Sequence, residues 1–318
     1  MTVRGFLFHG DGGDAPFDLA SEGGHRIARE ELLWLDVSAI DEREIATICN
    51  ALGLSDRAVS ALERELAESR ATVMADAVEV VVLALVDGLD REPTPLQVLV
   101  GRGWIITRHA EPMPFLDERR ETIRDDRPVG RLSSVQFLVS LLDWHVDTFF
   151  RAAEELEEAV DRLDDAALRT DGGLLHRLVR MRRRIARVRH ILNKHREIFA
   201  ELSRPDFLPD LEPDDQQALA GVARRLDRAG EAVSHTREML LGTFDIHMTR
   251  TAQRTNDIMR VLTLASVILL PSVVIAGVMG MNFRVGFFDE PNMFWVVIGA
   301  MAFMALGTLG VARWRGWL

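Results

Sequence analysis

The chain has few of the residues from which covalent cross-links and metal clusters are built. Its 318 residues include one cysteine, Cys49, and no tyrosine. A single cysteine excludes a disulfide framework and a thiolate metal cluster, and we expect its side chain to be a small, buried, apolar group. The chain also has a deficit of positive charge: 38 Lys and Arg residues stand against 49 Asp and Glu residues, and the formal net charge is −11. A nucleic-acid-binding protein needs a basic surface, so we expect no nucleic acid among the partners.

Motifs of enzymes and of nucleotide-binding proteins are missing as well. No G-x-G-x-x-G or Walker pattern occurs, and Gly101-Arg102-Gly103 is typical of a hairpin turn between two strands. No Ser/His/Asp or Cys/His arrangement stands out, so we expect neither an enzyme nor a bound cofactor. Residues 1–13 contain no long apolar core and no cleavage site, in contrast to a signal peptide. We therefore expect the N-terminal part to remain in the cytoplasm.

The histidines of the predicted helices do not have the spacing of a metal site. No two of them lie three or four residues apart, which would place a pair of ligands on one helix face. His190 and His195 come closest, but five residues separate their directions by about 140° around a helix. Because arginines flank both, we expect these two histidines on a solvated face. The histidines considered are His176, His190, His195, His235 and His247.

Seven acidic residues form one face of a predicted helix. We interpret this face as solvated, or as a partner of the basic helix that follows it, with a cation-sensing surface as the alternative. The residues are Glu154, Glu155, Glu157, Glu158, Asp161, Asp164 and Asp165.

Two long apolar runs lie near the C-terminus. The first, from Val261 to Met281, has no ionisable residue, and the second extends from Met293 to Ala312. A bilayer core of about 30 Å requires about 20 apolar residues as helix, which each run supplies. Pro271 lies inside the first run, and membrane helices tolerate proline because neighbouring groups satisfy the freed carbonyl. We predict transmembrane helices over 261–282 and 293–312.

The distribution of arginines predicts the orientation in the membrane. Arg260 precedes the first span, and Arg313 and Arg315 follow the second. Cytoplasmic flanks carry an excess of basic residues, so both termini are expected in the cytoplasm. The three arginines would form a basic cytoplasmic mouth, with a basic tail over 313–318 and a periplasmic loop over 283–292.

The part before the spans has the pattern of a mixed α+β domain followed by long helices. Residues 1–131 contain β-branched runs at 4–10, 31–38, 78–87 and 96–110, with helices at 41–53 and 55–68. Residues 132–213 predict a helical hairpin region. Residues 214–260 predict a stalk that is continuous with the first span, roughly 100 Å of helix in all. The expected fold is a mixed sheet with flanking helices, a very long stalk helix and two transmembrane helices.

One stripe of the long helix has the profile of an ion pathway. Its residues recur every three or four positions and therefore share a face. The stripe is polar at its inner end, apolar in the middle and rich in glycine near its outer end, as in a pathway with a hydrophobic constriction. Two spans cannot enclose water, so several copies would be needed; the alternative is that the stripe packs on the second span. Its residues are Asn256, Met259, Thr263, Ser266, Leu270, Val273, Gly277 and Gly280.

Asn282 follows this stripe at the outer end of the first span. A ring of amide oxygens can accept hydrogen bonds from the water shell of a small divalent cation, which gives up that water reluctantly. Asp289 and Glu290 in the loop would raise the local cation concentration. We expect the metal to meet Asn282 through its hydration shell.

These residues resemble the CorA family of divalent-cation transporters. The resemblance rests on Gly280-Met281-Asn282 within "TNDIMRVLTLASVILLPSVVIAGVMGMNF", on the second span and on the terminal "RWRGWL". It implies a homopentameric funnel in a bacterial inner membrane, with the first spans around the pore and Gly280, Met281 and Asn282 at the outer entrance. It also implies that Asn256 lies in the inner pore, where Met259, Leu262 and Leu270 narrow the path.

Two departures from the family pattern concern the ion. Val278-Met279 replaces the usual tyrosine before the Gly-Met-Asn motif, and the stalk reads "GVARRLDR" at 221–228, where magnesium transporters carry an acidic stretch. Magnesium-gated closure is therefore not expected. Zinc is favoured, as in the similar ZntB branch, with magnesium, cobalt or nickel as other substrates. The alternative function is a membrane-anchored scaffold or cation sensor that transports nothing.

Overall fold

The computed structural model describes residues 3–11, 15–19, 27–28, 30–38, 42–86, 88–118, 120, 132–169, 173–204, 207, 211–281 and 292–315. It divides into two units, Met1–Thr243 and Phe244–Leu318, which we describe separately.

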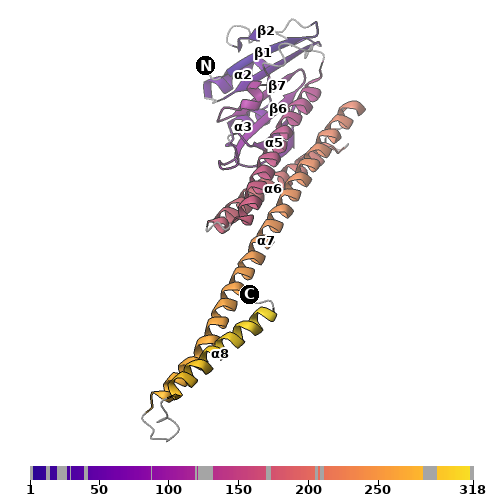
Figure 1. The fold of residues 1–318 in the computed structure, drawn as a ribbon. Helices are drawn as coiled ribbons and strands as arrows, with labels where there is room; N and C mark the ends of the chain where they lie inside the picture. The colour runs from indigo at the N-terminus through magenta and orange to yellow at the C-terminus, as the bar shows by residue number, and fades with distance from the viewer. Residues whose placement is uncertain are drawn as a thin grey trace. The chain divides into compact units, whose positions relative to one another are not determined.

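The first unit contains a seven-stranded mixed sheet (Figure 1). The strand order is β2-β1-β3-β7-β6-β5-β4. The β3–β7 pair is parallel and the other neighbours are antiparallel. The strands are β1 Val3–His9, β2 Ala15–Phe17, β3 Glu31–Val37, β4 Arg70–Val73, β5 Ala77–Ala84, β6 Thr94–Gly101 and β7 Trp104–His109.

Helices cover both faces of this sheet. Because successive strand residues point to opposite faces, Leu32 and Trp34 pack in the core that includes α5, while Leu33 and Leu35 pack against α2 and α3. The first core also contains α6 and the initial part of α7, up to Leu240. The helices are α2 Glu42–Leu52, α3 Asp56–Glu63, α5 Ser134–Leu168, α6 Leu174–Leu202, α7 Pro213–Met279 and α8 Met293–Trp314.

The predicted hairpin turn at Gly101-Arg102-Gly103 joins β6 to β7. Gly103 has φ +83°, which favours glycine. A Cβ on Gly101 would lie 2.1 Å from the indole ring of Trp104. Both glycines are therefore required by the turn and its packing, and neither belongs to a phosphate-binding loop.

The expected fold is confirmed in its main elements and differs in several details. β2 and β4, of three and four residues, were not predicted. The helix expected over 55–68 ends at Glu63, because Arg64 adopts an extended conformation with ψ 142°. Cys49 is partly exposed on α2 and is not the buried residue that we expected.

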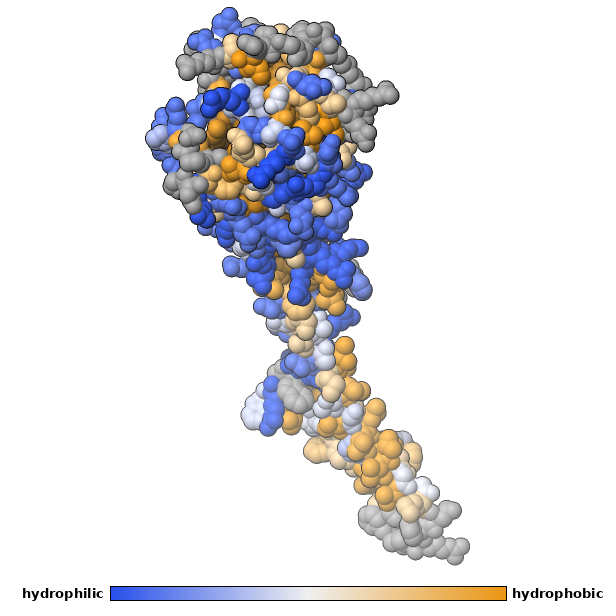
Figure 2. Space-filling model, turned by 180° about the vertical axis from the view of Figure 1, so that it is seen from behind, coloured by the Kyte–Doolittle hydropathy of each residue, from blue (hydrophilic) through white to orange (hydrophobic). Residues whose placement is uncertain are grey.

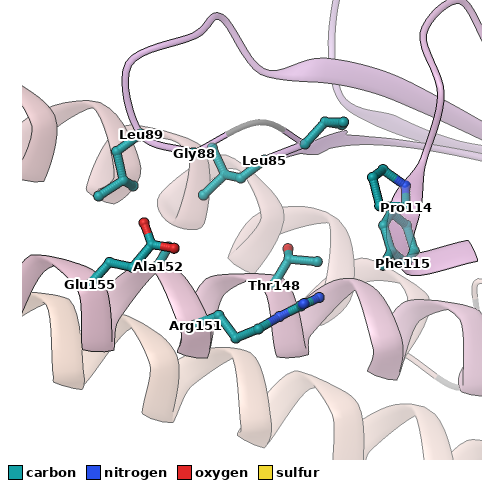
Figure 3. A pocket seen from close by; sticks show the side chains of 10 residues that line it. Leu85, Gly88, Leu89, Pro114, Phe115, Thr148, Arg151, Ala152 and Glu155 are labelled. Atoms are coloured by element: carbon teal, nitrogen blue, oxygen red, sulfur yellow. The ribbon is translucent and has the colours of Figure 1, made fainter. Parts of the chain in front are cut away.

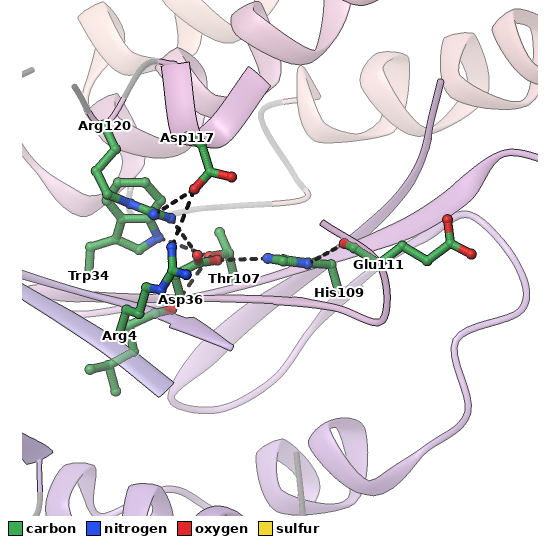
Figure 4. A network of polar contacts seen from close by, with 9 residues as sticks. Arg4, Trp34, Asp36, Thr107, His109, Glu111, Asp117 and Arg120 are labelled. Carbon is green, nitrogen blue, oxygen red and sulfur yellow. Dashed lines mark hydrogen bonds and ion pairs between the residues drawn. The ribbon is translucent and has the colours of Figure 1, made fainter. Parts of the chain in front are cut away.

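A buried polar network joins β3, β7 and the segment after β7 (Figure 4). Asp36 accepts a hydrogen bond from Thr107 Oγ1 at 2.7 Å and contacts His109 Nε2 at 3.1 Å and Arg120 Nη2 at 2.5 Å. His109 Nδ1 lies 2.6 Å from the carbonyl oxygen of Glu111. Both ring nitrogens of His109 thus lie within hydrogen-bond distance of oxygen atoms. The network holds charge of both signs inside the sheet.

Candidate functional site

The second unit contains two helices with the length and composition of membrane spans. They are the C-terminal part of α7 and the whole of α8, and none of the residues in their most apolar windows is buried within the chain. Figure 2 shows apolar side chains gathered on the surface of this unit. α7 continues through Pro271 without a break, as the sequence predicted for a helix in a membrane.

α7 and α8 pack against each other along one stripe of each helix. On both helices, the residues with reduced exposure recur at helical spacing, and α8 runs back beside the end of α7 in Figure 1. The contact is therefore a helical hairpin. On α7 these residues are Leu264, Ile268, Pro271, Ser272, Ile275 and Met279; on α8 they are Met293, Val297, Met301, Ala305, Thr308 and Ala312.

The stripe predicted to line a pathway lies on the other side of α7. At 100° per residue, its mean direction is about 180° from that of the residues that face α8. All eight members, from Asn256 to Gly280, are exposed, and Leu262 next to them is also exposed. The alternative that this stripe packs on the second span therefore does not hold within the described chain. The stripe is free to face other copies or water.

Two members of the stripe carry hydroxyl groups that bond to their own helix. Thr263 Oγ1 donates to the carbonyl oxygen of Met259 at 2.7 Å, and Ser266 Oγ donates to that of Leu262 at 2.9 Å. Isolated hydroxyls in an apolar helix commonly take this partner. Sequence reasoning placed both residues on the stripe but did not identify these bonds, although an isolated Ser or Thr in an apolar run is the signal for them.

The outer end of the stripe is described only in part. α7 ends at Met279, and Gly280 and Met281 continue as a turn whose amides donate to Ala276 O at 3.0 Å and Val278 O at 3.2 Å. Asn282, Asp289 and Glu290, the predicted entrance and loop residues, lie outside the described residues.

The three predicted basic-mouth residues lie where the apolar runs begin and end. Arg260 is exposed on α7, Arg313 is exposed in the last turn of α8, and Arg315 is exposed just after it.

The stretch 221–228 ties α7 to the helical hairpin of the first unit. Arg225 bonds to Asp143 and to Asp147 Oδ1, the latter at 2.6 Å, and Asp227 pairs with Arg196 at 2.6 Å. Burial alone would lower the pKa of Arg225, but the two carboxylates raise it. Arg225 therefore serves as a structural cross-link between α7 and α5.

His195 corrects an expectation from the sequence. Its side chain is fully buried in the core, where Nε2 accepts a hydrogen bond from the Leu83 amide at 2.9 Å. His145 of α5 is equally buried, with ring centroids 5.0 Å apart. Only His190 of the expected solvated pair is exposed. Two imidazoles do not make a metal site, and no group of three His, Cys, Asp or Glu side chains among the described residues could hold a metal ion.

A small cavity of the first unit contains no catalytic arrangement (Figure 3). It has a volume of about 120 Å³ and lies between α5, the segment after β5 and the segment around Phe115. Its polar side chains are Thr148, Arg151 and Glu155 of α5, and the remainder of its lining is apolar or glycine. No nucleophile lies beside a base among these residues, so the cavity supports no enzymatic function.

Comparisons with known proteins agree with this architecture. A cobalt/magnesium transport protein CorA from Thermotoga maritima is 28% identical over 207 residues, which cover 64% of this chain and 58% of that protein. The chain thus spans little more than half of this relative's length. A protein of the same name from Methanocaldococcus jannaschii is 21% identical, with 90% of this chain and 92% of that protein covered.

Solved structures share the fold, two of them along all or nearly all of the chain. The complete CorA magnesium transporter from Methanocaldococcus jannaschii matches with a TM-score of 0.84 and 21% identity, and each chain is covered fully. The full-length CmaX protein matches with a TM-score of 0.75 over 98% of this chain and 96% of that protein, at 21% identity. The cytoplasmic domain of ZntB from Vibrio parahaemolyticus is more distant, with a TM-score of 0.63 and 9% identity, covering 80% of this chain and all of that domain.

The sequence profile of the family described as CorA-like Mg2+ transporter protein matches residues 29–311, most of the chain. That family consists of transporters and not of enzymes. From the profile match, the shared fold and the two apolar C-terminal helices, we conclude that the chain is a membrane protein that belongs to the CorA-like family.

Proposed function

We propose that the protein passes divalent metal cations across a membrane, through a pore that several copies form with the exposed stripe of α7. The observation that carries the proposal is the position of this stripe, opposite to α8 and uncovered over its whole length from Asn256 to Gly280. A stripe that only anchored the chain would not need asparagine at its inner end and hydroxyls in its middle. Met259, Leu262 and Leu270 supply bulky apolar side chains that can close a pore by excluding water.

Asn282 and the two acids of the loop complete the proposed path at its outer end. Gly280 and Met281 lead to Asn282, whose amide oxygen would accept hydrogen bonds from water bound to the cation. Asp289 and Glu290 would concentrate cations at the entrance. Arg260, Arg313 and Arg315 would lie at the cytoplasmic side of a bacterial inner membrane, since basic residues mark that side.

Magnesium and cobalt are the cations that relatives support. The names of the relatives from Thermotoga maritima and Methanocaldococcus jannaschii both refer to cobalt and magnesium. The zinc preference expected from the sequence has no such support, because ZntB shares only the fold of its cytoplasmic domain at 9% identity. We therefore do not propose zinc as the substrate, and we include it only as a comparison cation in the flux measurement described below.

A flux measurement tests the proposal. The full chain in liposomes is expected to admit Mg2+ and Co2+ to an enclosed fluorescent indicator, with Zn2+ and Ni2+ compared under the same gradient. Asn282→Ala is expected to reduce the flux at least about tenfold, because the entrance loses its hydrogen-bond acceptors. Asn292→Ala, at the start of α8, is the matched control and should leave flux unchanged. Wild-type liposomes that admit no divalent cation would favour the non-transporting scaffold or sensor.

A further inference from the structure

Thr263 and Ser266 are the polar side chains within the apolar part of the stripe. Between Met259 and Gly280, the remaining stripe members are Leu270, Val273 and Gly277, which offer no polar side-chain atom. Thr263 and Ser266 are both exposed and lie three residues apart, a rise of about 4.5 Å along the helix. They therefore form one short polar step on an otherwise apolar surface.

The internal bonds of these two hydroxyls determine what they can offer to a ligand. A hydroxyl has one hydrogen to donate and two lone pairs that accept. Each hydrogen is already directed to the carbonyl oxygen four residues earlier, at 2.7 Å for Thr263 and 2.9 Å for Ser266. The exposed oxygens are thus left as acceptors. A surface that offers only hydrogen-bond acceptors binds ligands that donate hydrogen bonds.

The water around a cation has the matching polarity. Water bound to a cation turns its oxygen inward and its hydrogens outward, whereas water around an anion presents its oxygens. Acceptor oxygens therefore bind the shell of a hydrated cation and not that of a hydrated anion. A small divalent cation keeps this shell because removing it is costly.

We propose that Thr263 and Ser266 form an inner binding site for the hydrated divalent cation, one that contacts its water and not the metal. The inference rests on the proposed function, since copies of the stripe must surround the path. In such an assembly, the two side chains of each copy make two stacked rings of acceptor oxygens between Leu262 and Leu270. The site would shorten the apolar stretch that a hydrated ion has to cross.

The double variant Thr263→Val with Ser266→Ala tests this site. Both substitutions remove the hydroxyl and keep an apolar helix, so no buried donor is left without a partner. We expect the flux of Mg2+ or Co2+ into liposomes to fall about tenfold, in line with the loss of hydrogen bonds to a charged shell. Ser272→Ala is the matched control, because Ser272 Oγ also bonds within the helix, to Ile268 O at 3.4 Å, but lies on the side facing α8.

Unchanged flux in the double variant, with normal flux in the wild type and a loss in Asn282→Ala, would overturn the inner site and leave the proposed function standing. A wild type without flux would remove both. A fall in flux of equal size in Ser272→Ala would also contradict the site, since it would indicate a general effect of losing hydroxyls.

Thiol labelling provides a readout that does not depend on flux. Cys49 is the only cysteine, so Cys49→Ser gives a background without thiols. In that background, Ser266→Cys is expected to react with a small cationic methanethiosulfonate and only slowly with an anionic one. Ser272→Cys should react with neither. Equal reaction of Ser266→Cys with both reagents, or with neither, would contradict a water-filled site that selects cations.

Discussion

At the scale of single residues, the carboxylate of Asp36 holds the buried network of the sheet together. Burial alone would raise its pKa, but hydrogen bonds from His109 and Thr107 and the charges of His109 and Arg120 lower it below the ordinary value of 3.8. Because the folded pKa is lowered, ionised Asp36 stabilises the fold above pH 3.8. This contribution is lost as the pH falls through the folded pKa.

We predict that Asp36→Asn destabilises the first unit by about 3 kcal/mol, since Arg120 and His109 lose a buried counter-charge. The thermal midpoint of the full chain in detergent, followed by tryptophan fluorescence, should fall by roughly 6–12 °C. Asp165→Asn removes a carboxylate from the exposed face of α5 and should leave the midpoint unchanged. Equal midpoints for both variants would show that the network is not a source of stability.

The buried histidines predict a second loss of stability on acidification, which begins at a higher pH than that of Asp36. Burial lowers the pKa of His145 from 6.5 to about 3, and burial together with His145 lowers that of His195 well below 6.5. Between about pH 6.5 and 3, the unfolded chain therefore binds protons that the folded chain does not. Stability is fully present above pH 6.5 and declines as the pH falls, by about 1.4 kcal/mol per pH unit for each histidine.

His145→Leu should flatten this decline, because the substitution removes one of the two titrating groups. The imidazole nitrogens of His145 have no hydrogen-bond partner in the described structure, so stability near pH 8 should change little. The measurement is unfolding by denaturant at pH 8 and pH 5. His190→Leu, which removes an exposed histidine, should keep the wild-type slope; a wild-type slope in His145→Leu would refute the assignment.

At the scale of elements, the N-terminus of α5 carries a capping box. Ser133 accepts a hydrogen bond from the Gln136 amide at 3.0 Å, and the Gln136 side chain accepts one from the Ser133 amide at 3.2 Å. Ser133 Oγ also donates to Asp215 of α7 at 3.3 Å. Loss of such a cap costs about 1 kcal/mol.

Ser133→Ala should therefore lower the thermal midpoint by roughly 2–4 °C, measured on the full chain in detergent. Ser134→Ala alters the next serine, which caps nothing, and serves as control. Equal thermal midpoints for the two variants would show that the cap makes no measurable contribution to the stability of α5.

The elements themselves were largely predictable from the sequence, because long periodic runs dominate them. β5 and the hairpin of β6 and β7 have β-branched residues bounded by turns, and α5 has apolar residues at helical spacing throughout. β2 and β4 were missed because three or four residues give no periodicity to detect. Their pairing depends on the neighbouring strand, which a local pattern does not contain.

The candidate site was predictable in part, because its residues also recur at helical spacing in a long run. The spacing of the stripe fixed which α7 residues share a face, whereas the side that faces α8 could be chosen only once both helices were in place. For His195, the prediction from the sequence was wrong. Flanking arginines suggested a solvated face, although Val188, Leu192 and Phe199 place His195 in the apolar stripe of α6.

At the scale of the whole molecule, we predict an assembly of copies, since one protomer leaves its stripe uncovered. The glycines of the spans agree with this. A Cβ on Gly277, Gly299, Gly307 or Gly310 would meet no atom within 4 Å among the residues that the structure describes, so packing among those residues does not require the glycines. Native mass spectrometry from mild detergent should give five times the protomer mass of 35.7 kDa; a monomer under these conditions would contradict the assembly.

Cys49 on α2 is the only cysteine of the chain and is partly exposed, so one dye can be attached to each protomer and the protomers of an assembly can be counted. Burial raises the pKa of Cys49, and the Glu63 carboxylate adds to this, so maleimide dyes will couple to Cys49 more slowly at neutral pH than to an exposed thiol. One fluorophore per subunit follows from the composition. Stepwise photobleaching of single particles then reports stoichiometry in a native bilayer, free of detergent.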